Sequence, residues 1–535
     1  MGGHIPYESR SDYATVALLI LTVGLFCFDV FILSYGINNG INDFHGFRQS
    51  QTALTAYWLD REPHGLAYIT PVLGHPWSVP FEYPVYQWIV VLLMKVGVPL
   101  VVGGRIVSFA AFVGCLVPLK VMARDFNVPN RAFLFVAVVY LACPFYIFWS
   151  RTFMIDTTAL LFSLCWLAGF VRFGRSPSPT LWLATVVFGI LAALTKSITF
   201  LSIGPVAGAL FLTEAFSWLR KDRTRRGFLG LFARGALCLI PLAACYAWVV
   251  TSDLIRSANP FGLYMESTAL LQWNFGTLAQ RLALGNTIIG SLGTIFGYVG
   301  LLVPLLVCMG LINKRYRAVI VGAIAAYLSV FLIFTNLHIL HMYYQVSNAI
   351  FVCVAIGISI ASIMDKGWHK VAAVMLVCIL ISQAQFFHEF FWRYIQYDNV
   401  GDPMILTAQA ARDATKSNES LLFFGENFSS VVPFYSERKS LGVVPWASPP
   451  LFDKMISDPQ SLLGDAPLGG IIDCRHPLQT SEQIARVSSW LYSAEQTAKI
   501  DALLTAGQFF ITDALMARDR GNSGLSSLWS RMLPV

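Results

Sequence analysis

The sequence predicts an all-α bundle of membrane-spanning helices followed by a small domain of mixed α and β structure. Of the 535 residues, 56% are hydrophobic and only 13% are charged, and the mean hydropathy is +0.62. A soluble core of this length does not use so much apolar surface, so we expect a polytopic membrane protein. From about Tyr397 the composition changes to that of an ordinary soluble protein, which predicts the second domain.

Eleven apolar runs are predicted to be transmembrane helices, each of which takes about 17 to 25 residues. The first, Ala14–Tyr35, carries Asp29 and precedes no small-residue cleavage site, so we expect it to remain as an anchor. The others are Arg105–Ala123, Ala132–Trp149, Thr157–Val171, Leu181–Leu194, Ser197–Phe216, Phe228–Val250, Thr287–Leu311, Ala318–Thr335, Ser347–Ile363 and Val371–Phe387. Together these runs predict a membrane domain over residues 1–396.

A twelfth apolar segment, Val85–Val101, decides the orientation of the bundle. If it lies along the interface without crossing, five basic loops, including the dense run Arg220–Arg226, fall on the side of the N-terminus, as the positive-inside rule requires. Lys95 then reaches water by snorkelling. We therefore expect a cytoplasmic N-terminus and read the net charge of +7 as membrane topology, with no nucleic acid as partner. The outer face receives the loop 38–83, Ser150–Asp156, Lys196, Thr251–Asn286 and Asn336–Tyr344.

The tail, residues 397–535, is predicted to be a small periplasmic α/β domain. Four short apolar runs indicate buried strands: Ser420–Gly425, Ser440–Pro445, Gly469–Asp473 and Gln508–Thr512. Helices are expected between them at Ser481–Tyr492 and Asp501–Ala506. The tail has no Gly-rich phosphate loop, which argues against nucleotide binding.

The first outer loop, residues 38–83, contains charged side chains close to the membrane. Asp43 is a candidate general base, a metal or substrate ligand, or the cap of a helix over Phe47–Leu59. Arg48, at the start of that helix, either holds an anionic head group or belongs to a solvated surface pair. Glu82 lies between aromatic residues and needs a cationic partner, a metal or a substrate hydroxyl; alternatively it is a helix-start residue.

Further polar side chains are expected at the same outer face. Arg151 and Asp156 bracket a junction of two helices and form either an ion pair or part of a site. Lys196, with no charged neighbour in sequence, either neutralises a phosphate or snorkels. The pair His338 and His341 either shares a metal ion or is structural, and Tyr343 and Tyr344 line the site or belong to the aromatic belt.

Taken in order, these motifs resemble the GT-C glycosyltransferases, in particular the branch of protein O-mannosyltransferases and lipid A aminoarabinose transferases. Phe81-Glu82-Tyr83-Pro84 is similar to a family motif that reads approximately Phe-Glu-Lys-Pro, with Tyr83 in place of the lysine. Phe44 follows Asp43 where the family commonly has Asp-Glu. The other matching segments are Gly104–Ser108, Ser150–Arg151 with Asp156, Leu194–Lys196 and His341–Tyr344. The resemblance covers about residues 14–390.

The resemblance implies a GT-C fold in a multi-pass protein of the bacterial inner membrane, with membrane lipids around it. It implies transfer of a sugar from a polyprenyl-phosphate carrier to a lipid, glycan or protein acceptor on the outer side. Asp43 would be the base of an inverting reaction, with Glu82 and Asp156 as further catalytic carboxylates. A divalent metal, if needed, would bind Asp43, Glu82 and Asp156. Arg48, Arg151 and Lys196 would contact the carrier phosphate, and the substrate pocket would include His45, Tyr83, His338, His341, Tyr343 and Tyr344.

A different class of function competes with this reading. In a transporter or flippase of lipid-linked sugars, Asp29, Lys196 and the histidines would line a pathway. In a non-enzymatic assembly or sensor protein, the tail would bind glycan, and Asp43 and Glu82 would be dispensable. The mutational response of Asp43 distinguishes these readings from a transferase.

Overall fold

The computed structural model describes residues 7–221, 224–474 and 492–506. The chain forms two compact units, each assembled from segments that are distant in sequence. The first contains residues 1–39, Glu82–Thr251 and Ser267–Asp398. The second contains Gly40–Phe81, Ser252–Glu266 and residues 399–535. The second unit therefore includes most of the first outer loop as well as the tail.

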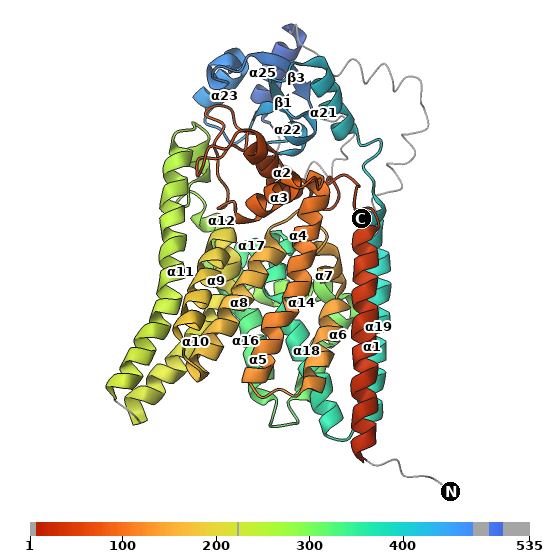
Figure 1. The fold of residues 1–535 in the computed structure, drawn as a ribbon. Coiled ribbons are helices and arrows are strands. Elements are labelled where there is room, and N and C mark those ends of the chain that lie inside the picture. Colours follow the sequence, from red (N-terminus) through yellow and green to blue (C-terminus); the bar gives the residue numbers. More distant parts are fainter. Residues whose placement is uncertain (1–6, 222–223, 475–491, 507–535) are drawn as a thin grey trace. The chain divides into compact units, whose positions relative to one another are not determined.

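The first unit is helical, and each of the eleven predicted spans falls on helices. Seven of the described helices or helix pairs are long and apolar enough to cross a membrane. Figure 1 shows the long helices running side by side. The elements are α1 (Tyr7–Ser34), α3 (Val85–Lys95), α4 (Leu100–Gly114), α5 (Leu116–Asp125), α6 (Asn130–Leu141), α7 (Pro144–Trp149), α8 (Asp156–Arg175), α9 (Pro179–Thr195), α10 (Ser197–Lys221), α11 (Arg225–Ser257), α12 (Leu271–Phe275), α13 (Leu278–Leu282), α14 (Leu284–Phe296), α15 (Val303–Gly310), α16 (Arg317–Ile333), α17 (Thr335–Leu340), α18 (Ala349–Asp365), α19 (His369–Phe386) and α20 (Trp392–Gln396).

The first helix, α1, is mostly apolar on its surface and packs through one narrow face. The ring of Phe28 contacts Phe387, with centroids 6.1 Å apart, and Tyr35 contacts Trp392 at 4.9 Å. Phe28 and Tyr35 are themselves partly exposed, whereas Asp29 is buried together with Leu18 and Ile32, with 2% of its surface exposed. Neither of its carboxylate oxygens has a hydrogen-bond partner among the described residues.

The segment that decides the predicted orientation forms the short helix α3. Its 11 residues span about 16 Å at the α-helical rise of about 1.5 Å per residue. That length is about half the thickness of a bilayer's hydrocarbon core. The shortness of α3 favours a position along the interface, and the orientation of the bundle stays a prediction.

The second unit contains a three-stranded parallel sheet of order β2-β1-β3. Its strands are β1 (Ser420–Phe424), β2 (Lys439–Gly442) and β3 (Leu468–Asp473), and its helices include α2 (Gly46–Arg61), α21 (Pro403–Ala414), α22 (Val431–Ser436), α23 (Pro449–Ser457) and α25 (Ala494–Ala506). Three predicted strands are thereby confirmed, as is the helix at Asp501–Ala506. The predicted strand Gln508–Thr512 and the predicted helix Ser481–Tyr492, except Tyr492 itself, lie outside the described residues.

The first outer loop shares a hydrophobic core with this sheet. Residues 71–74 run beside β2: the amide of Ser440 donates to the carbonyl of Pro71 over 3.1 Å, and that of Gly442 donates to Val72 over 2.9 Å. Leu54 and Trp58 of α2 belong to the same buried cluster as residues of β1 and β2. The loop is an ordered part of the second unit because burial of its apolar residues and pairing with a strand offset the entropy of ordering it.

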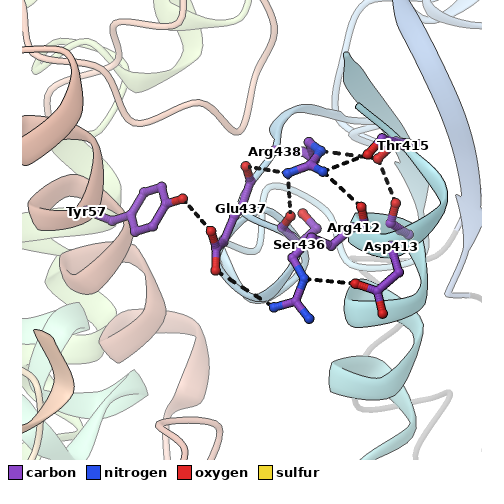
Figure 2. Close-up of polar contacts among 8 residues, drawn as sticks. Tyr57, Arg412, Asp413, Thr415, Ser436, Glu437 and Arg438 are labelled. Atoms are coloured by element: carbon purple, nitrogen blue, oxygen red, sulfur yellow. Dashed lines mark hydrogen bonds and ion pairs between the residues drawn. The ribbon is translucent and has the colours of Figure 1, made fainter. Parts of the chain in front are cut away.

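Polar contacts join α2 to α22 and fix the end of α21 (Figure 2). The hydroxyl of Tyr57 donates to Oε2 of Glu437 over 2.7 Å. Arg438 is buried, with 8% exposed, and its guanidinium donates to the carbonyls of Arg412 and Thr415 over 2.8 and 2.7 Å. These carbonyls lie at the end of α21, where the helix leaves acceptors without an intrahelical partner. Arg438 thus satisfies acceptors that would otherwise be buried unpaired.

Replacing Arg438 by Met is expected to lower the free energy of unfolding of the second unit by about 3 kcal/mol, because several buried carbonyls lose a charged donor. Arg412→Met is the matched control. The Arg412 side chain is 38% exposed and pairs with Asp413 at 3.1 Å, so its loss should cost less than about 1 kcal/mol. Thermal unfolding and limited proteolysis of the full-length protein in detergent measure both variants. Equal effects of the two substitutions would contradict the role of Arg438.

Candidate active site

Two breaks between helices bring a carboxylate and an ammonium together in the first unit. Asp156 is the first residue of α8, where the helix dipole favours a negative charge. Lys196 is an extended residue between the end of α9 and the start of α10. The Lys196 ammonium forms an ion pair with Oδ1 of Asp156, and the two side chains are only 6% and 4% exposed. Asp156 is therefore both a helix-start residue and half of a buried charge pair.

Aromatic rings cover the ammonium of Lys196. Its Nζ lies 4.5 Å from the ring centroid of Tyr344 and 5.0 Å from that of Tyr343. Both distances fit cation–π interactions, which are stronger in a desolvated site. The ring of His341 lies 5.5 Å from that of Tyr343. The structure thus brings together the predicted residues Asp156, Lys196, His341, Tyr343 and Tyr344.

His338 faces the same cluster as a neutral imidazole. Its Nδ1 donates to the carbonyl of Phe334 over 2.9 Å, and its ring centroid is 6.1 Å from that of Tyr344. Burial and the positive charge of Lys196 together lower the pKa of His338 to about 4, against the raising effect of the hydrogen bond to Phe334. Nε2 is consequently an acceptor, and it has no hydrogen-bond partner among the described residues.

The turn between α7 and α8 carries Arg151, which is buried with 1% of its surface exposed. This turn is held by its own hydroxyls: Ser150 donates to the carbonyl of Ile147 over 3.1 Å, and Thr152 donates to Trp149 over 2.8 Å. The hydroxyl of Ser108 on α4 donates to the carbonyl of Met154 over 2.9 Å. A guanidinium is therefore fixed in a rigid turn five residues before Asp156.

Glu82 lies just before α3 and is 8% exposed. The side-chain amide of Gln87 donates to its Oε1 over 3.2 Å. The helix itself starts at Val85, so Glu82 precedes it. The neighbouring Tyr83 packs edge-on against Trp88 and Trp248, at 5.1 and 5.0 Å. Glu82 is thus held as a hydrogen-bond acceptor within an aromatic setting.

Asp43, His45 and Arg48 belong to the second unit, at the start of α2. His45 precedes the helix in a left-handed conformation with φ 60°. The side-chain amide of Gln49 donates to Oδ1 of Asp43 and, over 3.2 Å, to the carbonyl of Phe44. The helix cap is His45, without a side-chain cap bond, so the alternative of Asp43 as the cap is wrong. Arg48 donates to the side-chain oxygen of Gln51.

A carboxylate pair that the sequence did not indicate lies near Asp43. Asp402 caps α21 and accepts a hydrogen bond of 2.9 Å from the side-chain amide of Asn42. Glu426 follows β1, and burial together with the negative charge of Asp402 raises the pKa of Glu426 to about 7. Asp402-Pro403 is a recognisable helix-start signal. No sequence pattern marks Glu426, because Asp402, the charge beside it, is 24 positions away in the sequence.

A divalent metal does not fit the residues proposed for it. No group of three or more His, Cys, Asp or Glu side chains among the described residues is arranged to hold a metal ion. Asp156 is already paired with an ammonium, which opposes a cation there. Glu82 accepts from an amide. We therefore derive no catalytic step from a metal.

No family model and no curated protein matches the chain. Several solved structures are similar to it, among them two of one protein. The crystal structure of ArnT from Cupriavidus metallidurans bound to undecaprenyl phosphate matches with a TM-score of 0.52 and 13% identity, over 91% of this chain and 96% of that one. The structure of ArnT from the same organism in the apo state covers 85% and 90%, with a TM-score of 0.48 and 12% identity. The first likeness confirms the predicted fold class, an ArnT-like GT-C fold. The seven apolar helices long enough to cross a membrane among the described residues support a multi-pass membrane protein.

The raised pKa of Glu426 predicts a pH dependence of stability. Between about pH 4.3 and pH 7 the folded state holds a proton that the unfolded state has lost, so stability falls as the pH rises through this window. Glu426→Gln should flatten this dependence and stabilise the protein by about 1–2 kcal/mol at about pH 8. Thermal unfolding at several pH values tests it. The control, Glu495→Gln, changes a side chain that is 78% exposed and should leave the pH profile unchanged.

Proposed function

We propose that this chain is a membrane glycosyltransferase that moves a sugar from a polyprenyl-phosphate carrier to an acceptor on the outer, periplasmic side of the membrane. The observation that carries the proposal is the buried pair of Lys196 and Asp156 under the rings of Tyr343 and Tyr344. The GT-C fold supports it, since the similar ArnT structure contains undecaprenyl phosphate. The acceptor is a lipid, a glycan or a protein.

In this proposal Lys196 and Arg151 bind the carrier phosphate. A buried ammonium is stable only with a partner, and a phosphate offers it strong, charge-assisted hydrogen bonds. Asp156 keeps Lys196 charged and oriented before the substrate arrives. Arg151 stands in the turn that leads to Asp156. Arg48 is a third candidate phosphate contact, which would take over the role of the family-motif lysine that Tyr83 replaces in this chain. As the phosphate departs, these cations stabilise the charge that grows on it.

The reaction is a direct displacement at the anomeric carbon. A hydroxyl oxygen or amine nitrogen of the acceptor bonds to this carbon while the bond from the carbon to the phosphate oxygen breaks. The phosphate leaves with the bonding electrons, and Asp43 takes the acceptor's proton. The amide of Gln49 orients the carboxylate of Asp43 for this step. One displacement without a covalent intermediate inverts the anomeric configuration.

The remaining polar groups bind the sugar and the acceptor. Nε2 of the neutral His338 accepts a hydrogen bond from a sugar hydroxyl, which a protonated imidazole would not do. Glu82 accepts a hydrogen bond from an acceptor or sugar hydroxyl. The rings of Tyr83, His341, Tyr343 and Tyr344 give the sugar faces to pack on, and His45 lines the part of the pocket beside Asp43.

Lys196→Met is expected to weaken binding of undecaprenyl phosphate at least tenfold, because the phosphate loses a buried cation. The matched control is Lys370→Met, at an exposed position of α19, which should bind the carrier normally.

Asp156→Asn tests the ion-pair partner of Lys196: it should reduce the rate of transfer while the carrier still binds. Native mass spectrometry measures the bound carrier. Unchanged carrier binding in Lys196→Met would contradict the proposed phosphate site.

Asp43→Asn is expected to lower turnover by about 10²–10⁴-fold, the usual contribution of a general base, with carrier binding retained. Transfer of a labelled sugar from synthetic polyprenyl-phosphate sugars measures turnover. Asp60→Asn, near the other end of α2, is the control and should stay active. A flippase would keep its activity in Asp43→Asn, and that result would favour transport over transfer.

The proposed orientation places Asn127 and Lys314 on the cytoplasmic side. Both are exposed, so single cysteines there, in a protein whose native cysteines are replaced, should resist an impermeant thiol reagent in intact cells. A cysteine at Gln272, in the predicted outer loop 251–286, should react. Reaction of the first two cysteines in intact cells would reverse the orientation.

A further inference from the structure

A groove separates α10 from α11 in the first unit. Its volume is about 580 Å³, and its walls include Phe211, Ala215 and Trp218 of α10 and Phe232, Gly235 and Leu239 of α11. These residues are three, four or seven positions apart, so each set occupies one face of its helix. Ala215 on α10 and Gly235 on α11 have small side chains, or none, and therefore leave space between the facing sides of the two helices.

Contacts with α8 and α9, and one ion pair with α10, hold α11 in place beside the groove. The indole of Trp166 on α8 donates to the carbonyl of Leu237 over 2.9 Å, and that of Trp182 on α9 donates to Ala233 over 2.9 Å. The guanidinium of Arg234 donates to the carbonyl of Phe170 over 3.3 Å and forms an ion pair with Glu214 of α10. These contacts keep α11 at its place while its apolar face towards α10 remains open.

The surroundings of the groove determine the chemistry of its occupant. Both helices are long and apolar enough to cross a membrane, at Ser197–Arg220 and Gly227–Ser257. The groove walls carry no charged side chain among the described lining residues. Pockets for drug-sized ligands measure about 300–1,000 Å³, so there is room for a hydrocarbon chain. A lipid acyl chain is the apolar molecule available in a bilayer.

Basic residues stand at one end of this groove. Arg220 ends the α10 span, two residues after Trp218, and its guanidinium lies 4.2 Å from the ring of Phe216. Arg225 begins α11, three residues before Phe228 of the groove wall. Both side chains are exposed. In the predicted orientation this end faces the cytoplasm, where the leaflet carries anionic lipids that basic residues attract.

We propose that this groove binds one acyl chain of an anionic diacyl phospholipid, with the phosphate head group between Arg220 and Arg225. This site is independent of the proposed transferase site, which lies at helix breaks in other parts of the first unit and at α2. The apolar walls would pack against the acyl chain, and the guanidinium groups of Arg220 and Arg225 would favour a negatively charged head group.

The test compares phosphatidylglycerol with phosphatidylcholine of the same acyl chains, titrated onto the full-length protein in detergent and counted by native mass spectrometry. We expect at least a tenfold preference for phosphatidylglycerol. The double variant Arg220→Gln/Arg225→Gln should abolish the preference. Its control, Arg175→Gln/Lys370→Gln, removes two exposed basic residues elsewhere and should keep it. Equal binding of both lipids by the unmodified protein would overturn the proposal.

A second variant tests the groove without touching charge. A Cβ at Gly235 meets the ring of Phe211 at an ordinary 3.8 Å, so Gly235→Leu fits the helix and fills the groove. It should reduce phosphatidylglycerol binding at least tenfold. Gly230→Leu is the control, because a Cβ there meets nothing within 4 Å. Undiminished binding in Gly235→Leu, or displacement of phosphatidylglycerol by undecaprenyl phosphate with equal affinity, would also overturn the proposal.

Discussion

The structure depends on one constraint: in a bilayer, backbone polar groups need internal partners, so spanning segments are helices and breaks are tolerated only where other groups satisfy them. The breaks around Asp156 and Lys196 meet this condition. Hydroxyls of the 150–152 turn donate to carbonyls of α7, Ser108 donates to Met154, and Lys196 forms an ion pair with Oδ1 of Asp156. Breaks of this kind put charged groups at fixed positions between the ends of the helices. The proposed phosphate site follows from that placement.

The same constraint explains which parts of the fold the sequence reveals. A membrane helix needs a long apolar run, so hydropathy located the spans, and the change of composition located the tail. Asp156 and Lys196 stood out because charges are rare beside such runs. The ion pair between them could not be predicted from the sequence. The two residues lie 40 positions apart, and nothing in the local sequence specifies which helix ends meet. The hydrogen bond from Gln49 to Asp43 could not be predicted either, because in the sequence Gln49 looks like any other polar residue on a helix.

The sequence did not predict that most of the first outer loop folds together with the tail in the second unit. Residues 40–81 looked like a membrane loop, yet they pair with β2 and share the buried cluster of the sheet. Contacts between residues 71–74 and 440–442 bridge most of the chain and leave no periodic signal. The consequence concerns function: α2, which carries Asp43 and Arg48, is built into the same core as the tail, and Tyr57 and Glu437 join the two. The tail therefore has a structural role in holding the proposed base.

We propose that the carrier is cleaved at the anomeric carbon and that the sugar is transferred with inversion. The most direct measurement follows a panel of synthetic polyprenyl-phosphate sugars of known anomeric configuration, incubated with the purified full-length protein and cell-envelope acceptors. Mass spectrometry detects free polyprenyl phosphate, and NMR reads the new glycosidic linkage. We expect release of the lipid phosphate together with a product of opposite anomeric configuration. Retained configuration, or a carrier that crosses the bilayer and is recovered intact, would contradict it.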